Sequence, residues 1–136
     1  MNSPQVKTKF LETLNKEQIK AVTIENESAL ILAGAGSGKT KVLTSRISWL
    51  IHNQITNPAG LLAVTFTNKA AKEMLMRVTD QLPIHTRGMW VGTFHGLCNR
   101  MLRIHHREVK FPETFQILDS SDQLSAIKRL MKAMNV

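Results

Sequence analysis

The chain has 136 residues, with 18 Lys and Arg against 10 Asp and Glu, and its formal net charge is +8. This length fits one domain, and the positive surplus favours a polyanionic partner such as nucleic acid, with plain solubility as the alternative. The single cysteine, Cys98, excludes an internal disulfide, and no apolar run suits a membrane span or a signal peptide, so we expect a reducing, cytoplasmic location and no membrane partner.

The first pattern along the chain is a helix start. Asn15 and Gln18 have the spacing of a capping box, and Leu14 and Ile19 have that of a hydrophobic staple. These signals predict a helix over residues 16–24. The preceding residues, 1–13, carry little pattern, and we expect them to be partly mobile.

A glycine-rich loop follows the apolar run 29–32, which predicts a strand, and precedes residues 39–52, whose apolar side chains recur with helical spacing. Strand, glycine-rich loop and helix in this order are typical of a phosphate-binding P-loop. We expect Lys39 to reach the terminal phosphates and the hydroxyl of Thr40 to bind Mg²⁺. The general motif has Gly where this chain has Ala33, and the alternative is a glycine-rich turn without a ligand.

Two more strands, each followed by a helix, continue the pattern. Residues 61–66 predict a strand, then a helix capped by Thr67 or Asn68 that ends near Leu82, and residues 89–91 predict a strand before a helix that begins after Thr93. Strands that alternate with helices predict an α/β fold with a parallel sheet flanked by helices. Beyond a polar linker with Pro112, the spacing of Ser120 and Gln123 predicts another capping box and a helix that continues to the end of the chain.

Two residues at strand or helix positions have competing interpretations. Phe66 lies at the C-terminal end of a strand, where ligands bind in open α/β sheets and where a ring can stack on any base. Without further information, a core position for this ring is the better interpretation. Cys98 shares a helix side with Leu97 and Met101, so we expect it in the core, and we read the methionines as core residues too.

Several stretches together resemble the N-terminal part of superfamily-1 DNA helicases of the UvrD, Rep and PcrA group. They are Leu14-Asn15-Lys16-Glu17-Gln18, Ala33 to Thr40, Ala63 to Ala71, Val91 to Leu97 and Phe115 to Ser120. The resemblance implies the first part of a RecA-like ATP-binding domain over residues 1–112. It also implies the start of an inserted helical subdomain over residues 113–136.

The resemblance implies an ATP and Mg²⁺ site, with Lys39 and Thr40 serving catalysis and Thr40 binding the metal. Gln18 matches the glutamine that reads adenine, so its capping role is an incomplete account. Lys41 stands where the family usually has Arg near the nucleotide. Arg77 matches an arginine that approaches the phosphates, and a solvated helix-face charge is an equal alternative. The implied site residues are Gln18, Ala33, Gly34, Ala35, Gly36, Ser37, Gly38, Lys39, Thr40, Lys41 and Arg77.

The resemblance also implies a site for single-stranded DNA. Its residues are Thr65, Phe66, Asn68, Thr93, Phe94 and His95. We assign His95 no chemistry, because a donor at a helix start is its simpler role. The implied whole is an ATP-dependent 3′–5′ DNA helicase of repair and replication, whose partners are single-stranded DNA, duplex junctions, the rest of the helicase chain and repair proteins.

Other function classes remain open on the residues alone, namely a small-molecule or nucleoside kinase and a nucleic-acid-binding module with a vestigial P-loop. The family has a pair of acidic residues, one of which holds Mg²⁺ through water while the other activates the attacking water, and this pair is missing here. The one local candidate, Asp119, lies at a helix start, where it can act as a cap. We therefore expect a fragment of a helicase that does not hydrolyse ATP at a useful rate alone.

Overall fold

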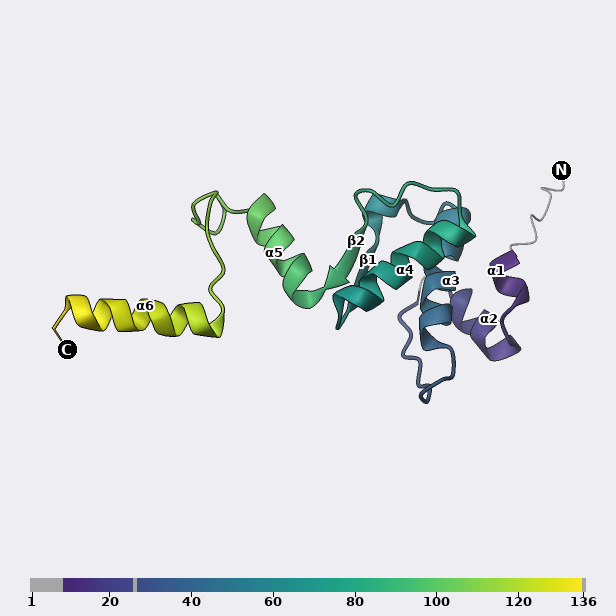
Figure 1. Cartoon of the computed structure of the whole chain (residues 1–136). Coiled ribbons are helices and arrows are strands. Elements are labelled where there is room, and N and C mark those ends of the chain that lie inside the picture. The colour runs from purple at the N-terminus through teal and green to yellow at the C-terminus, as the bar shows by residue number, and fades with distance from the viewer. Residues whose placement is uncertain (1–8, 26, 136) are drawn as a thin grey trace. The chain divides into compact units, whose positions relative to one another are not determined.

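The structure is a computed structural model that describes residues 9–25 and 27–135 (Figure 1). The chain divides into two compact units, the first ending at Cys98 and the second beginning at Asn99. None of the described helices is long and apolar enough to cross a membrane. The described elements are α1 Lys9–Glu12, α2 Lys16–Val22, α3 Lys39–His52, the 3₁₀ turn η1 Pro58–Gly60, β1 Leu62–Thr65, α4 Asn68–Gln81, β2 Trp90–Thr93, α5 Phe94–Ile104 and α6 Ser120–Ala133.

The sheet of the first unit consists of β1 and β2, which pair in parallel. Leu62 lies opposite Trp90, and Thr65 lies opposite Thr93. Parallel strands need a crossover connection, and here α4 supplies it and contacts both strands (Figure 1). The predicted parallel pairing of these two segments is confirmed, with the strands one to two residues away from the expected bounds.

The predicted strand over residues 29–32 is wrong for this structure. These residues are in no helix or strand, and the side chains of Leu30 and Leu32 are 86% and 87% exposed. A strand needs a neighbour that takes up its backbone N–H and C=O groups, and the sheet of the described residues contains only β1 and β2. The apolar run therefore has strand composition without a strand partner.

Two groups of buried side chains hold the first unit together. One joins α3, α4 and the sheet through Ile47, Ala63, Met74, Val78 and Met89. The other joins the N-terminal helices to α3 through Leu14, Val22 and Val42. Both groups include α3, so the helix that follows the glycine-rich loop is anchored from two sides.

The N-terminal helices explain how this second group forms. The capping box of Asn15 and Gln18 is present, and Ile19 packs in the group of Leu14, as the staple predicts. Helix α2 ends at Val22 rather than near residue 24. The turn α1 was not predicted, because four residues are too few to show a helical period. Phe10 of α1 is buried, and its ring lies edge-on to His52 at 6.4 Å between centroids.

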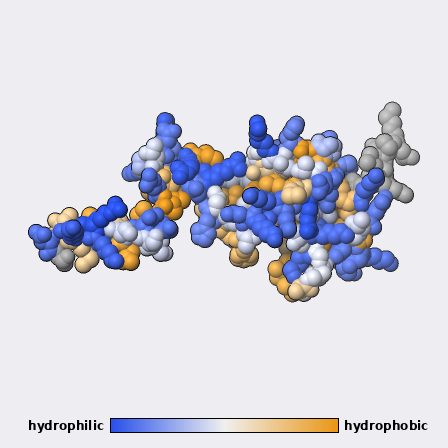
Figure 2. All heavy atoms as spheres, viewed as in Figure 1, coloured by the Kyte–Doolittle hydropathy of each residue, from blue (hydrophilic) through white to orange (hydrophobic). Residues whose placement is uncertain are grey.

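Some residues expected in the core are exposed. Cys98 is exposed although Leu97 beside it is buried, so the predicted core position of Cys98 is wrong. Met74 and Met89 are core residues as predicted, but Met76 is 65% exposed and Met134 is 71% exposed. Helical spacing identifies an apolar face, but burial requires an element packed against that face. Figure 2 shows hydrophobic surface beside hydrophilic surface on α6.

The start of α6 differs from the predicted capping box. Its N-cap is Asp119, not Ser120, and Oδ1 of Asp119 accepts hydrogen bonds of 2.8 Å from the backbone N–H groups of both Ser121 and Asp122. The hydroxyl of Ser121 donates to the same oxygen at 2.9 Å. The backbone N–H of Asp122, followed by the Ser121 hydroxyl, lowers the pKa of the Asp119 carboxyl below its ordinary value. The role of this carboxylate is thus that of a helix cap.

We predict that Asp119→Ala frays the first turn of α6, whereas Asp119→Asn keeps a capping oxygen and preserves it. Because the pKa of Asp119 is lowered by folding, its charged form stabilises the helix above the ordinary pKa of 3.8, and this contribution is lost as the pH falls through the lowered value. Amide exchange at Ser121 and Asp122, measured by NMR, checks this. Equal protection of these amides in the wild type and Asp119→Ala would contradict it.

Candidate functional site

The glycine-rich loop has the backbone conformation that its glycines allow. Gly36 and Gly38 adopt positive φ angles of 75° and 84°, which side chains with a Cβ rarely adopt. Gly38 is the N-cap of α3, and no side chain caps this helix. The first N–H groups of α3 have no acceptor within the helix, so this end of α3 can receive an anion.

Lys39 is folded onto the carbonyl groups of the loop. Its Nζ donates to the carbonyl oxygens of Ala33 at 2.9 Å and Gly34 at 2.6 Å. The hydroxyl of Ser37 donates to the same Gly34 oxygen at 2.7 Å. An anion that approaches the loop therefore competes with two carbonyl groups for the ammonium of Lys39. Thr40 is exposed at the first turn of α3, as is Ala35 in the loop.

Helix α2 contacts the loop through Gln18. The side-chain Oε1 of Gln18 accepts from the backbone N–H of Asn15 at 3.0 Å, which completes the capping box. Its Nε2 donates to the carbonyl of Ser37 at 3.1 Å. A Cβ at Gly38 would lie 3.1 Å from this Nε2, so the end of the Gln18 side chain would have to shift by a few tenths of an ångström, and the positive φ angle is the stronger reason for glycine here. The structure thus brings Gln18 to the loop, as the predicted site requires.

Two basic residues of α3 hold the N-terminal segment, and sequence reasoning missed their contacts. Nζ of Lys41 donates to the carbonyl of Thr13 at 2.6 Å. Arg46 donates to the carbonyls of Val22, at 2.7 Å, and Ile24, at the end of α2. All three pairs are more than 20 residues apart in sequence, and none of the partner carbonyls belongs to a recognisable pattern, so no local signal could have found them.

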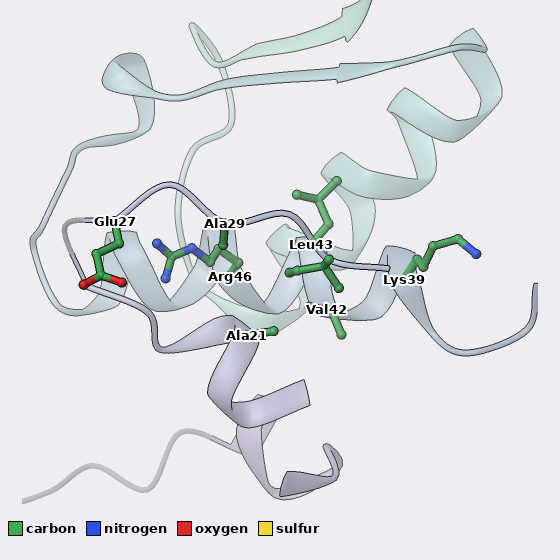
Figure 3. A pocket seen from close by; sticks show the side chains of 8 residues that line it. Ala21, Glu27, Ala29, Lys39, Val42, Leu43 and Arg46 are labelled. Carbon is green, nitrogen blue, oxygen red and sulfur yellow. The ribbon is translucent and has the colours of Figure 1, made fainter. Parts of the chain in front are cut away.

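A pocket of about 320 Å³ lies between α3, α2 and the run that precedes the loop (Figure 3). Figure 3 shows the amino end of Lys39 directed away from the other lining side chains, while Glu27 and Arg46 lie at the opposite end. The middle of the pocket is aliphatic, so its chemistry differs from that of the glycine-rich loop. The lining residues are Ala21, Glu27, Ala29, Ile31, Lys39, Val42, Leu43 and Arg46.

A second candidate site lies where β1 and β2 end. Because Thr65 and Thr93 are register partners, the residues that follow them, Phe66 and Phe94, are also neighbours. Their ring centroids are 6.4 Å apart, with planes tilted by 56°. Phe66 is 93% exposed and Phe94 is 58% exposed. The core interpretation of Phe66 is therefore wrong, and the two rings form an exposed aromatic pair.

The hydroxyl groups around this pair organise the starts of two helices. Thr67 accepts from the N–H of Ala70 at 3.1 Å and caps α4, and Thr93 accepts from the N–H of Gly96 at 3.2 Å at the start of α5. The hydroxyl of Thr65 donates to the carbonyl of Thr67 at 3.0 Å. Two of the predicted DNA residues, Thr65 and Thr93, thus have structural hydrogen bonds in this structure.

The remaining predicted residues of this site are exposed. Asn68 and His95 lie in the first turns of α4 and α5, next to the aromatic pair in sequence.

Arg77 was predicted for the nucleotide site. It is exposed near the middle of α4, and its side chain has no hydrogen bond or ion pair among the described residues. Its approach to the phosphates stays a prediction.

Comparison with known proteins gives relatives for nearly the whole chain. DNA helicase II of Escherichia coli (strain K12) is 53% identical over 127 residues, which are 93% of this chain and 18% of that protein. DNA helicase II of Haemophilus influenzae is 50% identical over 132 residues, 94% of this chain and 18% of that protein. ATP-dependent DNA helicase PcrA of Staphylococcus epidermidis is 43% identical over 127 residues, 93% of this chain and 17% of that protein.

The chain thus spans less than a fifth of the length of these relatives. The family model described as the UvrD/REP helicase N-terminal domain matches residues 14–136, which include both candidate sites. The chain therefore belongs to the UvrD/REP helicase family and carries its N-terminal domain.

Proposed function

We propose that the chain is the ATP- and single-stranded-DNA-binding segment of an ATP-dependent 3′–5′ DNA helicase of repair and replication. The observation that carries this proposal is the exposed pair of Phe66 and Phe94, which the sheet register brings together from two separate stretches of sequence. The names of the relatives, DNA helicase II and PcrA, support the same class.

The proposed nucleotide site uses the loop and the start of α3. The N–H groups at this end of α3 bind phosphate oxygens, and Lys39 moves from the carbonyls of Ala33 and Gly34 to the terminal phosphates. The hydroxyl of Thr40 binds Mg²⁺, a hard ion that prefers oxygen ligands and neutralises phosphate charge. The cofactors of this proposal are ATP and Mg²⁺.

The proposed DNA site uses the aromatic pair and the two helix starts beside it. Stacking on Phe66 and Phe94 accepts any base, and the N-termini of α4 and α5 favour phosphate groups. The net charge of +8 adds an attraction that salt screens. Duplex junctions, the rest of the helicase chain and repair proteins are the further partners of the proposal, and the cytoplasm is its location.

We predict that Lys39→Ala lowers the affinity for Mg²⁺-ATP by roughly tenfold or more, because charge-assisted hydrogen bonds to phosphate are lost. Titration with a fluorescent ATP analogue checks this. Lys72→Ala is the matched control, since it removes one exposed lysine of α4 and should leave the affinity unchanged. Equal affinities of the wild type and Lys39→Ala would contradict the nucleotide site.

We predict that Phe66→Ala weakens binding to single-stranded DNA by about 1–3 kcal/mol, whatever the base sequence. Since the side chain is 93% exposed, its truncation should leave the melting temperature unchanged. Phe66→Trp should keep the affinity, and Met76→Ala, at another exposed apolar position, should have no effect on DNA binding. Binding and melting curves for these variants check this, and unchanged DNA affinity in Phe66→Ala would refute the stacking role.

We predict that this chain alone does not hydrolyse ATP at a useful rate, with or without single-stranded DNA. The reaction needs carboxylates that hold Mg²⁺ and orient water, and Asp119 instead caps α6 in the second unit. A phosphate-release assay measures the rate. DNA-stimulated turnover that Asp119→Asn abolishes would identify Asp119 as the metal carboxylate and overturn this expectation.

A further inference from the structure

Residues 105–111, which follow α5 and which we call the basic turn, have a backbone that is closed by two hydrogen bonds (Figure 1). The backbone N–H of Phe111 donates to the carbonyl of His106 at 2.8 Å. Nδ1 of His106 in return lies 3.1 Å from the carbonyl oxygen of Phe111, and since a carbonyl oxygen can only accept, the histidine is the donor. The basic turn belongs to the second unit, and these two bonds fix the place of Phe111 in it.

Two aromatic rings and a guanidinium group lie together beside the basic turn. The ring centroids of Phe111 and Phe115 are 5.3 Å apart, with planes tilted by 54°. The guanidinium carbon of Arg103, in the last turn of α5, lies 4.8 Å from the centroid of the Phe115 ring, at a distance suited to a cation–π contact. Phe115 is half-buried, whereas Phe111 is 46% exposed. The ring of Phe111 is thus supported by its neighbours while part of it remains open to solvent.

Positive charge surrounds this ring. Residues 100–115 include four Lys and Arg against two acidic residues, Glu108 and Glu113. The carboxylate of Glu108 is paired at 3.2 Å with a histidine of the same turn. The side chains of Arg107 and Lys110 are exposed and form no hydrogen bond or ion pair among the described residues. Two cations are therefore available to an anionic ligand beside an exposed aromatic ring.

This combination of groups suits single-stranded nucleic acid better than other polyanions. Exposed cations bind the phosphates, and an exposed ring stacks on a base of any identity. A duplex offers the same phosphates but keeps its base faces inside the stack, where a surface ring does not reach them. A polyphosphate has no base at all. Only the single strand uses both the charges and the ring of the basic turn.

We propose that the basic turn is a second contact surface for single-stranded DNA, on which Phe111 stacks on a base while Arg107 and Lys110 bind phosphates. This inference rests on the proposed function for its choice of ligand, and it uses none of the residues of the aromatic pair at the ends of β1 and β2. The sequence shows only a polar linker here, because the ring pair forms when the loop between His106 and Phe111 closes.

The ring is tested by titrating the 136-residue chain with a fluorescent oligothymidylate, in a Phe66→Ala background that weakens the first surface. Phe111→Ala and Phe111→Leu, which remove the aromatic face, should each lower the remaining affinity roughly fivefold or more. Phe111→Trp should keep the affinity. Val109→Ala is the matched control, since it shortens another apolar side chain of the basic turn, 42% exposed, and should change nothing.

The charges are tested by the salt dependence of the same titration. Arg107→Gln combined with Lys110→Asn removes both cations, and Asn tolerates the positive φ of 56° at position 110. The slope of log affinity against log salt should become shallower by about 1.4, which is about 0.7 for each lost phosphate contact. Lys128→Gln combined with Lys132→Gln, at two exposed positions of α6, is the matched control and should keep the slope.

Amide hydrogen exchange at Phe111 shows which variants keep the basic turn, because this N–H donates within it. Unchanged DNA affinity in Phe111→Ala and Phe111→Leu would refute the inference, and a loss in Phe66→Ala alone would then leave the proposed function standing. Equal losses for oligothymidylate, duplex DNA and tripolyphosphate would make the basic turn a general phosphate surface, which also overturns it. A loss at Phe111 without any loss at Phe66 would support the second surface and contradict the first.

Discussion

The parallel ladder between β1 and β2 is the constraint on which both candidate sites of the first unit depend. Its register places Thr65 opposite Thr93, so that Phe66 and Phe94 meet at the same edge of the sheet. It also requires a crossover, and α4 fills this role by packing on both strands and on α3. Met74 of α4 lies in this core, which also fixes the helix that follows the glycine-rich loop.

The glycine-rich loop depends on contacts from outside its own sequence. Within the loop, positive φ angles at Gly36 and Gly38 permit the turn into α3. From outside, Gln18 reaches the loop carbonyl of Ser37, and Lys41 reaches back to Thr13. A P-loop motif therefore accounts for the turn into α3, while the neighbouring α2 determines what lies beside the loop.

Sequence patterns predicted the elements whose signals are local. The capping box of Asn15 and Gln18 depends on residues three apart, and α3 has the predicted bounds of residues 39–52. Predictions that needed a partner were less successful. Residues 29–32 have strand composition but no neighbour in the sheet of the described residues, and Cys98 lies on an apolar helix that leaves it exposed. The domain boundary between residues 112 and 113 stays a prediction.

By itself, the sequence determined the starts of α2 and α3, the glycine-rich loop and the family resemblance, because each is encoded by side chains within a few residues of one another. Only the tertiary structure decided that Phe66 is exposed beside Phe94 and that Lys41 holds Thr13. The physical reason is distance along the chain: these contacts join residues about 28 positions apart, and they form only when packing and strand register bring the separate segments together.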